Sequence, residues 1–208
     1  MGQYYRPLLI YENGEQRSAY THDFQNGLKL MEHSWIGNNF VNAILHEIKD
    51  NPARVAWLGD YSDDVVDEIA ESELDFGSGF ITSHKDFTEK YQSVWSEDRV
   101  KDLPSSTEQI DLSLESADGF YLVNMTKKCY IDMGRYVKDN SMPNRFGDDG
   151  TWCINPLPLL TCVGNGMGGG DYYSDAGKED VGSWAFDQIY ITYLRPGDFE
   201  EVRYFFYE

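Results

Sequence analysis

The chain has 208 residues, which is enough for one large domain or two small ones. Hydrophobic residues at 41% and aromatic residues at 15% supply a packed core and exclude a disordered chain. The 36 acidic and 17 basic residues give a net charge of -19, which argues against direct binding to nucleic acid or to anionic membranes. Such a charge suits a basic protein partner, or serves solubility alone.

The compartment is predicted from what the sequence lacks. The N-terminus has no basic region followed by an apolar run, so we expect no signal peptide. No stretch approaches the roughly 18 apolar residues of a membrane helix. Cys129, Cys153 and Cys162 are odd in number and lack C-x-x-C spacing, which argues against a disulfide scaffold and a zinc site. A cytoplasmic protein is expected.

The first half of the chain reads as strands around a helix. Residues 4–24 have the pattern of a β-hairpin with Asn13-Gly14 in its turn. Residues 27–35 are either a short strand or the approach to the next element. Residues 38–52 carry the apolar spacing of a helix, and 53–61 read as a strand.

Two further helices are expected before a polar break. Residues 60–79 form an acidic segment with a narrow apolar stripe, and 86–100 show a second helical pattern. The polar stretch 103–109 is the candidate boundary between a first unit, residues 1–103, and a second, residues 104–208. One compact domain is the alternative.

The second half is predicted to be rich in strands. Its prolines, Pro156 and Pro158, predict an extended segment over 151–163 because proline disfavours helices. The fold class expected for the whole chain is α+β, with two related strand-rich units, few helices and a mostly antiparallel sheet. The predicted strands cover residues 110–116, 119–125, 128–133, 184–194 and 201–207.

The two halves also show a weak internal sequence repeat. Each opens on an aromatic-led hairpin, and each later places a tryptophan shortly before an aspartate, at Trp57 and Asp60 and at Trp184 and Asp187. This pattern predicts two related units packed together, with chance similarity as the alternative.

Several segments carry a family resemblance: MGQYY, GLKLMEHSWIGNNFV, WLGDYSDD, YLVNMTKKCYIDM, NPLPLLT and GNGMGGGDY with VGSWAFDQI. They resemble a family of acidic proteins from gut bacteria, their mobile elements and phages, which begin Met-Gly-Gln-Tyr and carry a Trp-Ala-Gly-Asp type motif. The resemblance covers about two-thirds of the chain and brings no established activity. Phe186 stands here where the relatives look to have glycine.

The glycine-rich stretch 164–170 fits G-x-G-x-x-G, a pattern that binds phosphates when a strand precedes it and a helix follows. Residues 171–184 show no helical stripe, and the loop lacks a Lys-Ser or Lys-Thr pair. A turn that needs glycine for its shape is the favoured interpretation. A ligand site between the halves is the alternative, lined by His33, Asp60, Gly166, Gly168 and Asp171.

Metal binding and catalysis find little support in the sequence. Asp60, Asp63 and Asp64 with His33 are oxygen and nitrogen ligands, but their spacing does not match a calcium loop. Carboxylates at this place are better explained as stabilising a helix N-terminus. No histidine lies in a nucleophile motif, so we predict no catalytic residue, no metal and no cofactor.

The acidic segment is the best candidate for a partner-binding site. On a helix its carboxylates form a row, which imitates nucleic-acid phosphates when it is offered to a basic groove. We therefore expect a non-enzymatic protein that binds a basic surface, such as the nucleic-acid channel of a host defence nuclease, which would make it an anti-CRISPR-like inhibitor in the host cytoplasm. An immunity protein against a basic toxin and an enzyme or ligand-binding module are the alternatives. The candidate partner-binding residues are Asp60, Asp63, Asp64, Asp67, Glu68 and Glu71.

Overall fold

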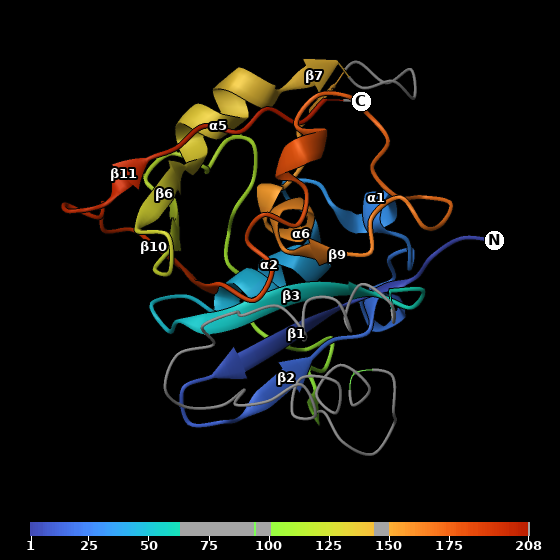
Figure 1. The fold of residues 1–208 in the computed structure, drawn as a ribbon. Coiled ribbons are helices and arrows are strands. Elements are labelled where there is room, and N and C mark those ends of the chain that lie inside the picture. Colours follow the sequence, from blue (N-terminus) through green and yellow to red (C-terminus); the bar gives the residue numbers. More distant parts are fainter. Residues whose placement is uncertain (63–93, 95–100, 144–149, 208) are drawn as a thin grey trace.

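The computed structural model describes residues 1–62, 94, 101–143 and 150–207 (Figure 1). In these ranges the chain is an α+β protein whose main sheet is mixed and mostly antiparallel, which confirms the predicted fold class. The sheet has the strand order β11-β6-β5-β10-β3-β1-β2-β4, and β9 pairs with β3 beside this path. The strands are β1 Tyr5–Tyr11, β2 Gln16–Ser18, β3 Ala53–Gly59, β4 Lys101–Asp102, β5 Tyr121–Asn124, β6 Cys129–Asp132, β7 Met142–Pro143, β8 Thr151–Trp152, β9 Cys162–Val163, β10 Gln188–Thr192 and β11 Glu200–Glu201.

Short helices cover this sheet. In Figure 1, α2 and α6 lie together over β3, whereas α5 lies beside β6. β7 and β8 form a separate two-stranded sheet. No helix among the described residues has the length and apolar character to cross a membrane. The helical elements are η1 Thr21–Phe24, α1 Leu30–His33, α2 Asn39–Glu47, α5 Met133–Asn140, α6 Pro156–Leu160 and η2 Lys178–Asp180.

The predicted N-terminal hairpin is confirmed over residues 5–18, whereas residues 21–24, expected to belong to its second strand, form η1. β1 pairs antiparallel with β2, and Gly14 takes a φ of 81° in the turn, a conformation that glycine adopts without strain. β1 also pairs along its whole length with β3, with Tyr5 opposite Gly59. Both strands are almost continuously apolar in sequence, as expected for central strands that are buried on both faces.

The helix predicted over residues 38–52 is confirmed as α2. The side chain of Asn38 accepts hydrogen bonds from the N–H groups of Phe40 and Val41, which satisfies donors that the first helical turn leaves free. Phe40, Ile44 and Ile48 follow at spacings of four residues and are fully buried.

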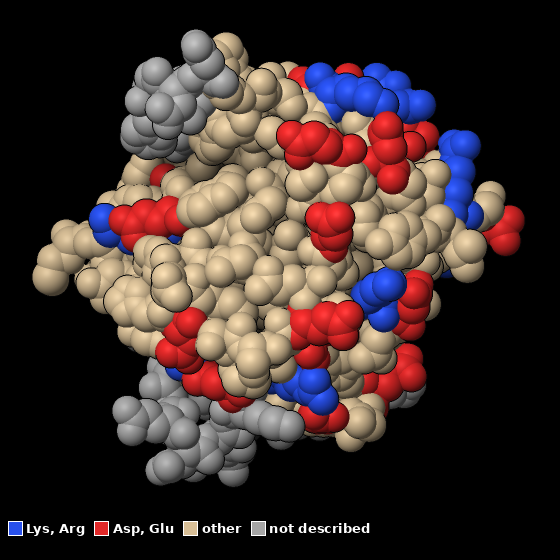
Figure 2. All heavy atoms as spheres, turned by 180° about the vertical axis from the view of Figure 1, so that it is seen from behind, with Lys and Arg blue, Asp and Glu red and all other residues tan. Residues whose placement is uncertain are grey.

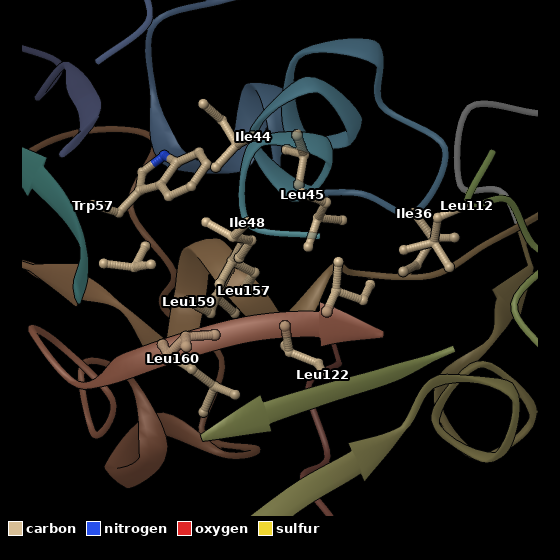
Figure 3. Close-up of a cluster of buried hydrophobic side chains, with 14 of the residues drawn as sticks. Ile36, Ile44, Leu45, Ile48, Trp57, Leu112, Leu122, Leu157, Leu159 and Leu160 are labelled. Carbon is tan, nitrogen blue, oxygen red and sulfur yellow. The ribbon is translucent and has the colours of Figure 1, made fainter. Parts of the chain in front are cut away.

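The core lies between the sheet and its helices. In Figure 3, Ile44 and Leu45 of α2 and Ile48, which follows the helix, point towards the leucines of α6, with Trp57 of β3 at one side and Leu122 of β5 at the other. Burying one such leucine or isoleucine contributes about 1.5–3 kcal/mol. The cluster joins residues from both halves of the sequence into one core.

The extended segment expected over residues 151–163 is wrong at its centre, where α6 forms, although its two ends are extended in β8 and β9. Asn155 caps this helix by accepting a hydrogen bond from the Leu157 N–H, at 3.1 Å. Pro156 and Pro158 then fall in the first turn, where backbone N–H groups have no partner inside the helix. Proline therefore loses no hydrogen bond at these two positions.

Other predictions in the second half hold only in part. The strands expected over 119–125, 128–133 and 184–194 are present as β5, β6 and β10, and β5 and β6 pair antiparallel. Of the strand predicted at 201–207, only Glu201 is in a strand, in β11.

Residues 110–116 do not form the predicted strand: residues 110–113 have no regular secondary structure, and residues 114–116 form a turn. The Ser113 N–H donates to the hydroxyl oxygen of Ser116, whose hydroxyl donates to the carbonyl of Asp111. Serine side chains that bond the nearby backbone in this way compete with strand pairing.

Two helices form where the sequence predicted none. Residues 27–35 contain the short helix α1 rather than a strand. α5 follows β6 directly, and the side chain of Asp132 caps it by accepting from the Arg135 N–H at 3.0 Å.

Strands from both halves share the main sheet. β10 and β9, from the second half, pair with β3, from the first. The boundary proposed at 103–109 lies between β4 and β5. The division into two related units stays a prediction.

The two helices predicted over 60–79 and 86–100 fall almost wholly outside the described residues. Within these ranges the structure describes residues 60–62, which follow β3, and Val94, which is helical and buried.

Candidate functional site

The glycine loop, residues 164–170, packs against the N-terminal segment. Gly169 forms a parallel bridge with Gly2, and the Gln3 N–H donates to the Gly169 carbonyl at 3.3 Å. The Met31 N–H of α1 donates to the Gly170 carbonyl at 3.0 Å. In Figure 1 the N-terminus, α1 and the loop lie on the same side of the molecule. The loop therefore holds the N-terminal segment and α1 against the second half of the chain.

Gly166 and Gly168 show why glycine is needed in this stretch. Gly166 has a φ of 93°, which side chains disfavour. At Gly168, a Cβ would lie 2.4 Å from the Cβ of Gln3 and 2.6 Å from its backbone nitrogen. Conformation at one position and close contact at the other account for glycine here, which supports the interpretation as a turn.

The carboxylate of Asp171 is bound by backbone N–H groups of the glycine loop. Its Oδ2 accepts hydrogen bonds from the N–H groups of Gly166, at 2.7 Å, and Gly168, at 3.0 Å. Successive N–H groups in such turns bind phosphates in other proteins. Here they bind a carboxylate that is only 3% exposed, so neither N–H is free for a phosphate.

Polar side chains surround the other end of the loop. The Gly164 carbonyl accepts from Gln3 Nε2 at 3.0 Å and from the Tyr5 hydroxyl at 3.4 Å. Burial raises the pKa of Tyr5, and the nearby Cys162 and Asp171 raise it further. Two buried oxygens of this group, Gln3 Oε1 and Asp171 Oδ1, have no hydrogen-bond partner in the described part of the chain.

His33 is fully buried and belongs to a different cluster. Its Nε2 accepts from the indole N–H of Trp57 at 2.9 Å, and its Nδ1 lies 3.1 Å from the Gly27 carbonyl. Burial lowers the pKa of His33 to about 4, although the Gly27 carbonyl and Glu32 favour the charged form. The ring is therefore neutral, with its proton on Nδ1, and it orients Trp57.

Asp60 follows β3 at the edge of the described residues. Its Oδ1 accepts from the Tyr4 N–H at 2.9 Å, and its own N–H donates to the Tyr4 carbonyl at 3.0 Å. No hydrogen bond or ion pair links Asp60, His33 and Asp171 to one another, and all three lie in the described ranges. The other candidate partner-binding residues lie outside those ranges: Asp63, Asp64, Asp67, Glu68 and Glu71.

Basic side chains of the described ranges are largely engaged by the chain's own carboxylates. Arg17 bonds both Glu15 and Glu47, and Glu201 pairs with two arginines, Arg135 and Arg195. On the face drawn in Figure 2, acidic side chains are spread over the surface and basic ones lie beside several of them. Further ion pairs join Arg6 to Asp102, Lys29 to Glu32, Lys127 to Asp187, Lys138 to Asp118 and Arg203 to Asp139.

The cysteines are buried and unreactive in character. Burial raises the pKa of Cys129 to about 11 and that of Cys153 to about 12, and it also raises the pKa of Cys162. A thiol with a raised pKa is a poor nucleophile at neutral pH. Among the residues that the structure describes, no group of three or more His, Cys, Asp or Glu side chains is arranged to hold a metal ion.

A pocket of about 390 Å³ lies beside the glycine loop. It is lined by residues 162–165, Met167, Lys178, 181–182 and Ala185. None of the candidate ligand residues His33, Gly166, Gly168 and Asp171 lines this pocket. The ligand site expected between the halves stays a prediction.

No protein-family model, curated protein or solved structure matches this chain.

Sequence reasoning did not identify Gln3 as part of this group. Its position in the MGQYY segment gives no sign that its side chain reaches a loop 161 residues away. The cluster of glycines, in contrast, did predict a turn that needs glycine for its shape.

Proposed function

We propose that this chain is a non-enzymatic cytoplasmic protein that binds a basic surface on another protein. The observation that carries the proposal is the segment 60–75, which holds eight carboxylates and no Lys or Arg. A groove lined with positive charge attracts such a segment through the same electrostatics that attract nucleic-acid phosphates.

The ion pairs of the described fold support this proposal. The basic side chains of the described ranges are largely paired with carboxylates of the same ranges, as Arg6, Arg17 and Arg135 illustrate. The range 63–100 carries 11 acidic and 3 basic residues, so it contributes eight of the 19 excess negative charges. Charge is thus concentrated in one stretch that adjoins β3.

In its most specific form, the proposal is that the chain inhibits a host defence nuclease, such as a CRISPR effector, by occupying its nucleic-acid channel. Its support is the acidic segment together with the resemblance to proteins of phages and mobile elements. An immunity protein against a basic toxin would use the same charge. The enzyme alternative is less favoured, because the glycine loop already binds the carboxylate of Asp171.

The test compares two variants with the same net charge. The first replaces three carboxylates of the segment: Asp64→Asn, Asp67→Asn and Glu71→Gln. The control makes the same three kinds of change at exposed positions outside the segment, Asp111→Asn, Asp198→Asn and Glu179→Gln. Each variant removes three of the 19 excess negative charges.

Wild type and both variants are immobilised, exposed to nuclease-treated bacterial lysate and eluted with a salt gradient. We expect wild type and control to retain a basic, nucleic-acid-binding protein that added duplex DNA displaces, and the segment variant to release it at lower salt. Equal retention by the segment variant, or a partner that DNA does not displace, would contradict the proposal.

A further inference from the structure

A buried carboxylate without a positively charged partner lies at the glycine loop. Asp171 is 3% exposed, and its Oδ1 has no hydrogen-bond partner among the described residues. The stem of Lys29 packs on Gly170, but its Nζ is directed to Glu32, at 3.1 Å. A carboxylate removed from water is strongly destabilising unless another charge or sufficient hydrogen bonds compensate it.

Gln3 presents a second buried oxygen in the same group. Its Nε2 donates to the Gly164 carbonyl, so Oε1 is the end of the amide that is left without a donor. Gly168 connects the two side chains, because it is packed against the Cβ of Gln3 and its N–H donates to Asp171. The Tyr5 hydroxyl, which donates to the Gly164 carbonyl at 3.4 Å, also lies close enough to Asp171 to interact with its side chain.

We propose that Asp171 Oδ1 and Gln3 Oε1 are ligands of a monovalent cation, Na⁺ or K⁺, bound between the N-terminal segment and the glycine loop. Both ligands are hard oxygen donors, which favour such ions over softer metals. Asp171 supplies one negative charge, which one monovalent ion balances, whereas Ca²⁺ sites in proteins commonly combine several carboxylates.

Cys162 and His33, which could bind softer metals, are not available as ligands. Burial raises the pKa of Cys162, so its thiol is neutral at physiological pH. The ring nitrogens of His33 are both engaged, with Trp57 and Gly27. A cation here would neutralise Asp171 and tie residues 1–3 to the loop, which would couple the fold's stability to the salt present.

The test measures thermal unfolding in NaCl, in KCl and in N-methyl-D-glucamine chloride at equal ionic strength, because all salts screen a chain of this charge. Asp171→Asn removes the charge while its amide oxygen still accepts from the loop. Asp175→Asn, at an exposed position in the same stretch, is the control with the same net charge.

We expect wild type and Asp175→Asn to show a saturable rise in Tm with one of the two ions, by about 2–4 °C at five times its Kd. In Asp171→Asn, the three salts should give the same Tm. Equal Tm values for wild type in all three salts, as a bound water would give, overturn the proposal.

A direct measurement covers the case in which Asp171→Asn does not fold. Crystals of the wild-type chain soaked in Tl⁺, an anomalous scatterer that substitutes for K⁺, should show a peak that contacts both Asp171 Oδ1 and Gln3 Oε1. Anomalous density absent from that position would overturn the proposal.

Discussion

Two segments that each begin with a buried tryptophan, residues 57–60 and 184–187, make similar backbone contacts, but we expect them to respond differently to pH. We call them the two tryptophan corners. Trp57 and Trp184 are both fully buried, and their backbone N–H groups donate to the Thr161 and Leu160 carbonyls, each at 2.7 Å. The two corners therefore satisfy neighbouring carbonyls at the C-terminal end of α6.

The indole partners make the difference. Trp57 donates to His33 Nε2, an acceptor that is lost when the ring is protonated, whereas Trp184 donates to the Tyr204 hydroxyl, at 2.9 Å in both cases. Burial raises the pKa of Tyr204, so this hydroxyl stays neutral at physiological and acidic pH. The indole hydrogen bond of Trp57 should therefore be lost in acid, whereas that of Trp184 should be kept.

The largest expected effect is the acid response of the first corner. The pKa of His33 is about 4 in the folded protein against an ordinary value of 6.5, so the unfolded chain binds a proton first as the pH falls. The stability that neutral His33 contributes is complete above pH 6.5 and decreases towards pH 4, by about 3 kcal/mol.

His33→Gln tests this response, because its amide can accept from Trp57 and donate to the Gly27 carbonyl at any pH. Urea unfolding at pH 7, 5 and 4 should show a smaller decrease for the variant than for wild type. Parallel decreases would show that His33 does not cause the acid sensitivity.

The second largest effect is expected at the third residue of each corner. Gly59 has no room for a Cβ, which would lie 1.7 Å from Gln3 Nε2, whereas Phe186 has a φ of 63° that glycine would adopt more easily. Phe186→Gly relieves about 1–2 kcal/mol of strain but removes a buried ring worth about 3–5 kcal/mol, so a loss of about 2 kcal/mol is expected.

Phe186→Ala is the matched control, because it loses the ring and keeps a Cβ at positive φ. Chemical denaturation should rank wild type above Phe186→Gly and Phe186→Ala lowest, by about 1 kcal/mol. An alanine variant as stable as the glycine variant would show that the backbone at Phe186 is not strained.

Removing the partner in the second corner should have a smaller effect that does not depend on pH. Tyr204→Phe leaves the indole N–H of Trp184 without its acceptor, which costs about 1–2 kcal/mol. Urea unfolding between pH 7 and pH 4 should give a loss of constant size relative to wild type. A loss that changes between these pH values would show that the second corner also responds to acid.

Local patterns in the sequence predicted the elements that local interactions stabilise. The hairpin at Asn13-Gly14 and the helix capped by Asn38 were recognisable, because turn residues and caps act within a few positions. α6 was missed since Pro156 and Pro158 were read as helix breakers, although proline is compatible with a first helical turn.

The site was less predictable because its contacts are distant in sequence. Asp171 and the glycines were identified as candidates, but their bonding to each other depends on a turn geometry that composition does not specify. The contacts of Gln3 with the loop and of His33 with Trp57 depend on how the strands come together. Sequence patterns suggested His33, Asp171 and the glycines, but neither Gln3 nor the hydrogen-bond partners of these residues.

The smallest effect on stability is expected at Asp60, which ends the first corner and begins the acidic segment. In Asp60→Asn the amide oxygen can still accept from the Tyr4 N–H, so unfolding should change by less than about 0.5 kcal/mol. Its charge is nevertheless lost, so affinity for the proposed basic partner should fall about two- to fivefold at low salt. Binding measured at low and high salt, with exposed Asp198→Asn as the control, separates the two roles of this carboxylate. Equal loss in both variants would mean that the partner senses net charge alone, whereas a loss confined to Asp60→Asn would place its binding surface next to the first corner.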